Sequence, residues 1–77
     1  MNKELIERVV DNENKIIKYS LSYLREGEPL GKYHFVVLEV ELKDYDMMDD
    51  LKRKRFEESV VNRLRELKNN EIHHHQK

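Results

Sequence analysis

The sequence predicts a small α+β domain with its elements in the order helix, strand, strand, helix. Two runs, 15–25 and 32–43, alternate apolar and polar residues with the period of two that is typical of strands. Both glycines and the only proline lie between these runs and favour a turn that joins the strands into an antiparallel hairpin. From residue 44 to about residue 68, apolar residues recur at helical spacing, so we expect a long amphipathic helix to pack across the hairpin.

The N-terminal segment, residues 2–11, is predicted to form a short helix. Its large apolar residues are Leu5, Ile6, Val9 and Val10. They follow the spacing i, i+1, i+4 and i+5, which gives one apolar stripe on a helix. A helix of about three turns is marginal in isolation, so we expect it to dock against the sheet. A polar break with turn-forming side chains follows at 11–14.

The two predicted strands each have one apolar face. In the run 15–25 this face contains Ile17, Tyr19, Leu21 and Tyr23, and in the run 32–43 it contains His34, Val36, Leu38, Val40 and Leu42. The opposite face of the second strand is apolar in its first half, at Phe35 and Val37, and acidic in its second half, at Glu39 and Glu41. We therefore expect the N-terminal helix to cover Phe35 and Val37 while the two glutamates reach water.

The long helix has a clear core stripe and acidic residues near its start. The stripe consists of Phe56, Val60, Leu64 and Leu67, with Tyr45 just ahead of it. Asp44 and Asp46 are predicted to cap the helix, with Asp49 and Asp50 in its first turns. The pattern ends near Lys68, so residues 1–70 are expected to form a single domain and residues 71–77 a disordered polar tail that contains three histidines.

Length and composition limit the classes of protein that fit. A 77-residue chain with 38% apolar and 40% charged residues has a thin core, so a homodimer that completes the sheet or packs helices is expected. With 15 basic and 16 acidic residues, the surface as a whole is not an electrostatic footprint for nucleic acid. No apolar run is long enough to span a membrane, and no apolar leader is present near the start. We expect a cytoplasmic protein that does not associate with membranes.

A second apolar edge on the long helix gives the leading functional hypothesis. Met47, Leu51 and Val61 lie too far round the helix to join the core stripe. They are candidate contacts with a second subunit or another protein. The sequence is therefore interpreted as a non-enzymatic interaction or regulatory protein that acts by binding another protein.

The alternative hypothesis is a nucleic-acid-binding module that uses four adjacent cations, Lys52, Arg53, Lys54 and Arg55. Four successive helical residues spread over about 300° of arc, so these cations do not share one face. Acidic residues also alternate with them at a spacing of four, which is typical of an exposed helix.

The sequence contains no residue set that supports catalysis, and no cofactor or metal is predicted. Glu39, Glu41 and Lys43 at a strand end are similar to the cation-binding pattern of restriction-type nucleases, but the preceding strand lacks the further acidic residue that such a site needs. The aspartates from Asp44 to Asp50 do not follow the calcium-loop pattern, because its glycine and final glutamate are absent.

Overall fold

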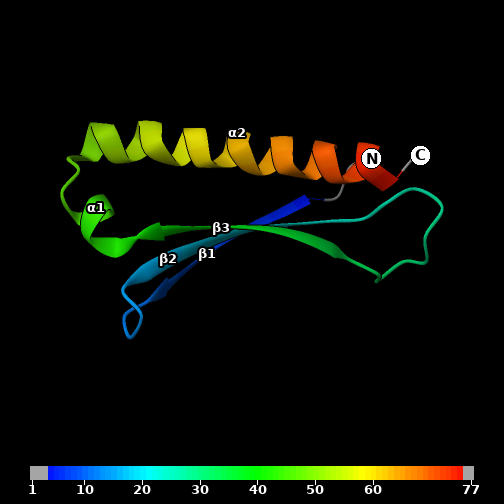
Figure 1. Ribbon diagram of the computed structural model, residues 1–77, viewed down its shortest axis with the longest axis horizontal. Coiled ribbons are helices and arrows are strands. Elements are labelled where there is room, and N and C mark those ends of the chain that lie inside the picture. Colours follow the sequence, from blue (N-terminus) through cyan, green and yellow to red (C-terminus); the bar gives the residue numbers. More distant parts are fainter. Residues whose placement is uncertain (1–3, 76–77) are drawn as a thin grey trace.

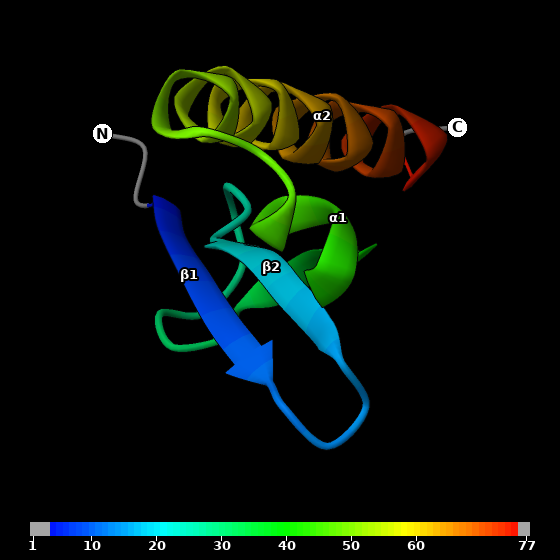
Figure 2. The same ribbon diagram turned by 90° about the vertical axis from the view of Figure 1, so that its left-hand side faces the viewer.

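The structure, a computed structural model, describes residues 4–75. The elements are β1 (Glu4–Asp11), β2 (Ile16–Tyr23), β3 (His34–Glu41), α1 (Leu42–Asp46) and α2 (Asp50–His75). The strands form one antiparallel sheet in the order β1-β2-β3. The long helix α2 runs along one side of this sheet (Figures 1 and 2). The α+β class, the antiparallel pairing and the long C-terminal helix are confirmed, whereas the predicted order of elements is wrong.

The N-terminal segment is a strand, not a helix. β1 pairs with β2 along its full length, from Glu4 opposite Tyr23 to Asp11 opposite Ile16. The i, i+1, i+4, i+5 spacing also fits a strand with apolar residues on both faces, and β-branched side chains favour that choice. Pairing with β2 also supplies backbone partners and a third strand, and two strands alone are marginal in water.

This third strand also replaces the expected dimer contact. The sheet was predicted to have two strands and to be completed across a dimer, but β1 of the same chain takes that position beside β2. β2 is therefore the central strand, and β1 and β3 form the two edges.

The turn between β1 and β2 is held by a single carboxylate. Asp11 Oδ1 accepts hydrogen bonds from the backbone N–H groups of Glu13, at 3.1 Å, and Asn14, at 3.0 Å. The Asn14 side-chain amide donates to Asp11 Oδ2 at 2.8 Å. The hydrogen bond from the Asn14 backbone is the main reason that the pKa of Asp11 is lowered. Lys15 ends the turn in the left-handed region, at φ 57°.

The connection between β2 and β3 contains two consecutive turns. The Glu28 N–H donates to the Arg25 carbonyl at 3.4 Å, and the Lys32 N–H donates to the Pro29 carbonyl at 3.2 Å. In each turn the third position is a glycine with positive φ, 81° at residue 27 and 93° at residue 31. A residue with a Cβ is strained in that conformation. The predicted antiparallel pairing of these two strands is confirmed, but they belong to a sheet of three strands rather than to a two-stranded hairpin.

The core lies between the sheet and α2. Its buried apolar residues are Ile17, Tyr19, Leu21, Tyr23, Val36, Val60 and Leu64. Partly buried residues packed against them include Ile6, Leu38, Val40, Leu42, Tyr45, Phe56, Leu67 and Ile72. The predicted core faces of both strands and the predicted stripe of the long helix are therefore confirmed.

No described helix has a stretch that is long and apolar enough to cross a lipid bilayer.

The start of the long helix differs from the prediction. Asp44 and Asp46 lie within the short helix α1, and Asp49 caps α2 by accepting a hydrogen bond from the Lys52 N–H at 2.8 Å. Arg53 joins the two helices, because its Nε donates to the Tyr45 carbonyl at 3.1 Å and its Nη2 donates to the Asp46 carbonyl at 3.3 Å. These bonds satisfy carbonyls at the end of α1.

The end of α2 also differs. The helix does not stop near Lys68 but continues to His75, and it therefore includes the first five residues of the predicted tail. Residues 76–77 lie outside the described part of the chain. Two contacts explain the extension: Ile72 packs against the core, and Glu71 Oε1 accepts a hydrogen bond from the Tyr23 hydroxyl at 3.0 Å. Tertiary contacts thus offset the weak helix propensity of the two asparagines at 69–70.

Candidate functional site

One face of the sheet carries α2, and the opposite face, called the open face below, has no helix or strand of residues 4–75 over it (Figures 1 and 2). The strand register assigns side chains to this face in four rows, because direct partners on neighbouring strands point the same way. The rows are Leu5, Ser22 and Phe35; Glu7, Ser20 and Val37; Val9, Lys18 and Glu39; and Asp11, Ile16 and Glu41.

One end of the open face is apolar and exposed. Phe35 is 61% exposed, Leu5 57% and Val37 45%. Tyr33, just before β3, is 46% exposed. The prediction that a helix covers Phe35 and Val37 is wrong, because the segment expected to form that helix is β1 itself. The result is a group of neighbouring apolar side chains that are open to solvent. We call these four residues, together with Ser22, the apolar end.

A shallow hollow lies within the apolar end. It has a volume of about 220 Å³ and is lined by Leu5, Ser22, Tyr33 and Phe35, with Glu4 at its margin. Ser22 forms its floor, because this small residue is the direct partner of both Leu5 and Phe35 and is only 5% exposed. A small side chain between two large ones leaves space that an apolar side chain of another molecule fits.

The other end of the open face is charged. It carries the carboxylates of Glu7, Asp11, Glu39 and Glu41, the ammonium of Lys18, and two apolar side chains, those of Ile16 and Val9, of which Val9 is 56% exposed. Asp11 is engaged by its own turn, and Glu41 lies 3.4 Å from the Lys43 ammonium. Glu7 and Glu39 are exposed. This end, called the acidic end below, therefore presents an excess of negative charge beside the apolar one.

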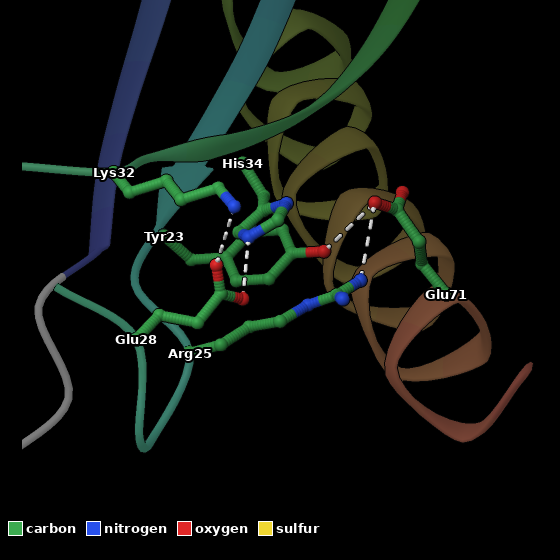
Figure 3. Close-up of polar contacts among 6 residues, drawn as sticks. All are labelled: Tyr23, Arg25, Glu28, Lys32, His34 and Glu71. Carbon is green, nitrogen blue, oxygen red and sulfur yellow. Dashed lines mark hydrogen bonds and ion pairs between the residues drawn. The ribbon is translucent and has the colours of Figure 1, made fainter. Parts of the chain in front are cut away.

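On the helix side, a polar cluster joins the β2–β3 loop to the C-terminal half of α2 (Figure 3). The Tyr23 hydroxyl donates to Glu71, and Arg25 Nη2 lies 3.6 Å from the same carboxylate. Beside them, His34 Nε2 donates to Glu28 Oε1 at 2.9 Å. The His34 ring stacks on Tyr23, with the ring centroids 5.6 Å apart.

The charges in this cluster compensate one another. The hydrogen bond from His34 is the main reason that the pKa of Glu28 is lowered, and Lys32, at 3.4 Å, acts in the same direction. Burial raises the pKa of Tyr23, and Glu71 adds to this. Among the described residues, Nε and Nη2 of Arg25 are buried without a hydrogen bond. Because Glu71 and Glu28 already face the cations, the cluster is best explained as a structural link rather than a site for an anion.

A second ionic link fixes the start of β1. Lys68 donates to Glu4, and Arg65 lies 3.7 Å from the same carboxylate. The hydrogen bond from Lys68 is the main reason that the pKa of Glu4 is lowered. Further along the strand, Arg8 lies 3.7 Å from Glu57. These contacts hold the edge strand beneath α2.

The three residues predicted to form an interaction edge are not contiguous. Met47, 85% exposed, lies between α1 and α2, and Leu51, 60% exposed, lies in the first turn of α2. Val61 is about 15 Å further along the helix. It lines a wide, shallow depression of about 700 Å³ on α2 that includes neither Met47 nor Leu51.

The basic segment is also divided. Lys52, Lys54 and Arg55 are exposed, but Arg53 is engaged with the carbonyls of α1 and lies over the Tyr45 ring, 4.8 Å from its centroid. Lys54 and Arg53 line the depression on α2 together with three carboxylates, those of Asp50, Glu57 and Glu58. The segment therefore does not form a uniform basic surface.

Sequence reasoning did not identify Leu5 or Ser22 as parts of an exposed surface. The β-branched residues of the first segment could have indicated a third strand and hence an uncovered face. Within the described residues, no group of three or more histidines or carboxylates is arranged to hold a metal ion.

No family model, curated protein or solved structure is detectably similar to this chain.

Proposed function

We propose that this chain is a non-enzymatic interaction or regulatory protein that binds another protein through the apolar end of its open face. The observation that carries the proposal is Phe35, an aromatic side chain 61% exposed on a strand and next to a hollow. Aromatic residues around a pocket are frequent anchors of protein interfaces.

The grouping of the side chains supports the proposal more than their exposure alone. Single exposed apolar residues are common on soluble proteins, whereas contiguous ones mark interaction surfaces. Leu5 and Phe35 lie in one row across the sheet, and Val37 lies in the next row. The paired strands also hold the backbone of these residues in place, so binding orders side chains but does not have to order a loop.

The experiment compares two charge-introducing variants with the unmodified protein in affinity capture from cells of its source. Phe35→Lys alters the open face, and Leu51→Lys is the matched control, because Leu51 is 60% exposed on α2. A protein retained by the unmodified chain and by Leu51→Lys, but lost with Phe35→Lys, is the expected result. Direct binding is then measured by calorimetry with the purified partner.

The reverse result contradicts the proposal. Loss with Leu51→Lys but not with Phe35→Lys would move the interface to the edge formed by Met47, Leu51 and Val61. Circular dichroism of each variant checks the fold. A second open-face variant, Ser22→Val, fills the hollow with a residue that favours strands, so it tests the surface without adding charge.

Two other predictions are tested on the same samples. A homodimer would appear as a doubled mass in light scattering. Nucleic-acid binding through Lys52–Arg55 would appear as retention of an oligonucleotide that weakens steeply with salt. The nucleic-acid alternative has less support, because Arg53 already bonds to α1 and carboxylates line the same surface.

The proposed compartment of this protein is the cytoplasm.

A further inference from the structure

The dimensions of the open face match those of a helix. A strand of eight residues spans about 27 Å, and the outer strands of a three-stranded sheet lie about 10 Å apart. A helix of about 18 residues has the same length and a diameter of about 10 Å. The opposite face of this same sheet already carries a helix, α2, along its length (Figure 1). A second helix on the open face would complete a three-layer arrangement.

The charges of the open face limit the chemistry of such a helix. At the acidic end, Glu7 and Glu39 are exposed; among the described strand residues of this face the one ammonium is that of Lys18, and Lys43 of α1 lies 3.4 Å from Glu41. A ligand that covers the whole face must therefore be apolar over Phe35 and must carry cations over Glu39 and Glu41. Without such cations, the four carboxylates of this end would lose water with only Lys18 and Lys43 among the described residues to compensate them.

A second copy of this chain fits less well if it packs face to face. With the strands aligned, the acidic end of one copy would meet the acidic end of the other. If only the apolar ends met, each copy would bury about 400 Å² at most, since an aromatic side chain contributes about 150–250 Å² when fully buried. Stable complexes bury about 800 Å² per partner.

We infer that the open face binds an amphipathic helix of a partner protein, with an apolar stripe over Leu5, Phe35 and Val37 and with lysine or arginine over Glu39 and Glu41. This inference rests on the proposed function and names the partner of the same surface. The apolar contacts anchor the helix in the hollow over Ser22. The cations fix its direction along the strands.

The test is a selection from a displayed library of 18-residue alanine-rich helices with randomised positions on one side. The unmodified protein is expected to enrich helices with large apolar residues on one half and an excess of lysine and arginine on the other. Their affinity should fall as salt rises from 50 to 500 mM, values chosen to shorten the Debye length from roughly 14 to 4 Å.

Three variants locate the binding and its charge dependence. Phe35→Lys should weaken a selected helix by about 10-fold or more, and Leu51→Lys should leave it within about 2-fold. The double variant Glu39→Lys/Glu41→Lys should weaken the basic helices by about 10-fold. A new selection on this double variant should enrich acidic helices. Circular dichroism confirms that each variant is folded.

The outcomes separate this inference from the proposed function. Enriched helices that depend on Phe35 but lack a basic excess would overturn the inference and leave the proposed function standing. Binding that ignores Phe35→Lys would count against both, whereas the absence of any enriched helix would count against the inference alone. A stable dimer that Phe35→Lys dissociates would show that a second copy occupies the face, and the inference would again be wrong.

Discussion

Individual polar residues in this protein connect elements that are distant in sequence. Glu71 on α2 holds Tyr23 and Arg25 of the β2 end, and Glu4 of β1 holds Lys68 of α2. Each link is partly buried, so its contribution to stability exceeds that of an exposed ion pair. These contacts fix where the hairpin lies under the helix.

The Glu71 link gives a direct prediction. Glu71→Ala should lower the free energy of unfolding by about 1–2 kcal/mol, because the Tyr23 hydroxyl loses its acceptor and Arg25 loses its counter-charge. Urea unfolding followed by circular dichroism measures the change. The matched control is Glu66→Ala, which breaks only an exposed pair with Arg63 at 3.0 Å and should change the value by less than about 0.5 kcal/mol. Equal effects of the two substitutions would contradict this account of α2.

The loop contact of Glu28 predicts a pH dependence. The pKa of Glu28 is lowered below its usual value near 4.5, chiefly by the hydrogen bond from His34. A lowered carboxyl pKa means that the unfolded chain binds more protons, so the contribution of Glu28 is complete above pH 4.5 and is lost as the pH falls through the folded value.

The measurement is the free energy of unfolding from pH 7 to pH 3 for the unmodified protein and for Glu28→Gln. The difference between the two proteins should be constant at neutral pH and should shrink below pH 4.5. A difference that stays constant down to pH 3 would show that Glu28 is not stabilised as a carboxylate. Glu4 and Asp11, whose pKa values are also lowered, remain in both proteins and do not affect the comparison.

At the scale of elements, the turn between β1 and β2 sets the fold of the N-terminal half. Asp11 accepts both backbone hydrogen bonds of the turn, and Lys15 then adopts the left-handed conformation that returns the chain to β2. The Lys15 carbonyl also accepts a hydrogen bond from the Leu42 N–H at 3.0 Å, which ties the turn to the start of α1. A turn of four residues thus positions β1, β2 and α1 together.

Replacement of Lys15 by glycine should stabilise the protein. A residue with a Cβ is disfavoured at φ 57° by about 1–2 kcal/mol, and part of this gain is offset by the greater freedom of glycine in the unfolded chain. We expect Lys15→Gly to raise the free energy of unfolding by up to about 1 kcal/mol in urea denaturation. Lys18→Gly, within β2, should lower it. If both substitutions destabilise to the same extent, Lys15 is not strained in solution.

At the scale of the whole molecule, residues 4–75 cover the sheet on one side only. Ile17 and Leu21 of β2 are fully buried beneath α2, whereas Phe35 and Val37 of β3 are exposed on the other side. The extent of the molecule is 43 × 24 × 23 Å, with α2 along the long axis (Figure 1). Both edges of the sheet, β1 and β3, lack a further strand among the described residues.

This architecture predicts the pattern of amide hydrogen exchange. β2 is paired on both sides, so its amides should exchange most slowly, at rates set by global unfolding. The outward amides of β1 and β3 should exchange faster, because local opening exposes them. Exchange followed by NMR checks this order. Protection of β1 equal to that of β2 would indicate that another chain covers this edge.

The sequence alone determined the elements whose residue pattern admits one reading. The alternation through Ile17 to Tyr23 predicted a buried strand face, the glycines at 27 and 31 predicted the hairpin, and the stripe through Val60 and Leu64 predicted the core side of the helix. The buried strand face, the antiparallel pairing of β2 with β3 and the core side of the helix are confirmed. In each, local periodicity and burial point to the same structure.

The tertiary structure decided the rest, because the deciding contacts join residues far apart in the chain. The spacing of Leu5, Ile6, Val9 and Val10 fits a helix or a strand, and only pairing with β2 selects the strand. Likewise, the asparagines at 69–70 favour a helix end, and only Tyr23 and the core around Ile72 keep α2 helical beyond them. The open face follows from the first of these choices: once residues 4–11 join the sheet, nothing in the described chain remains to cover Phe35.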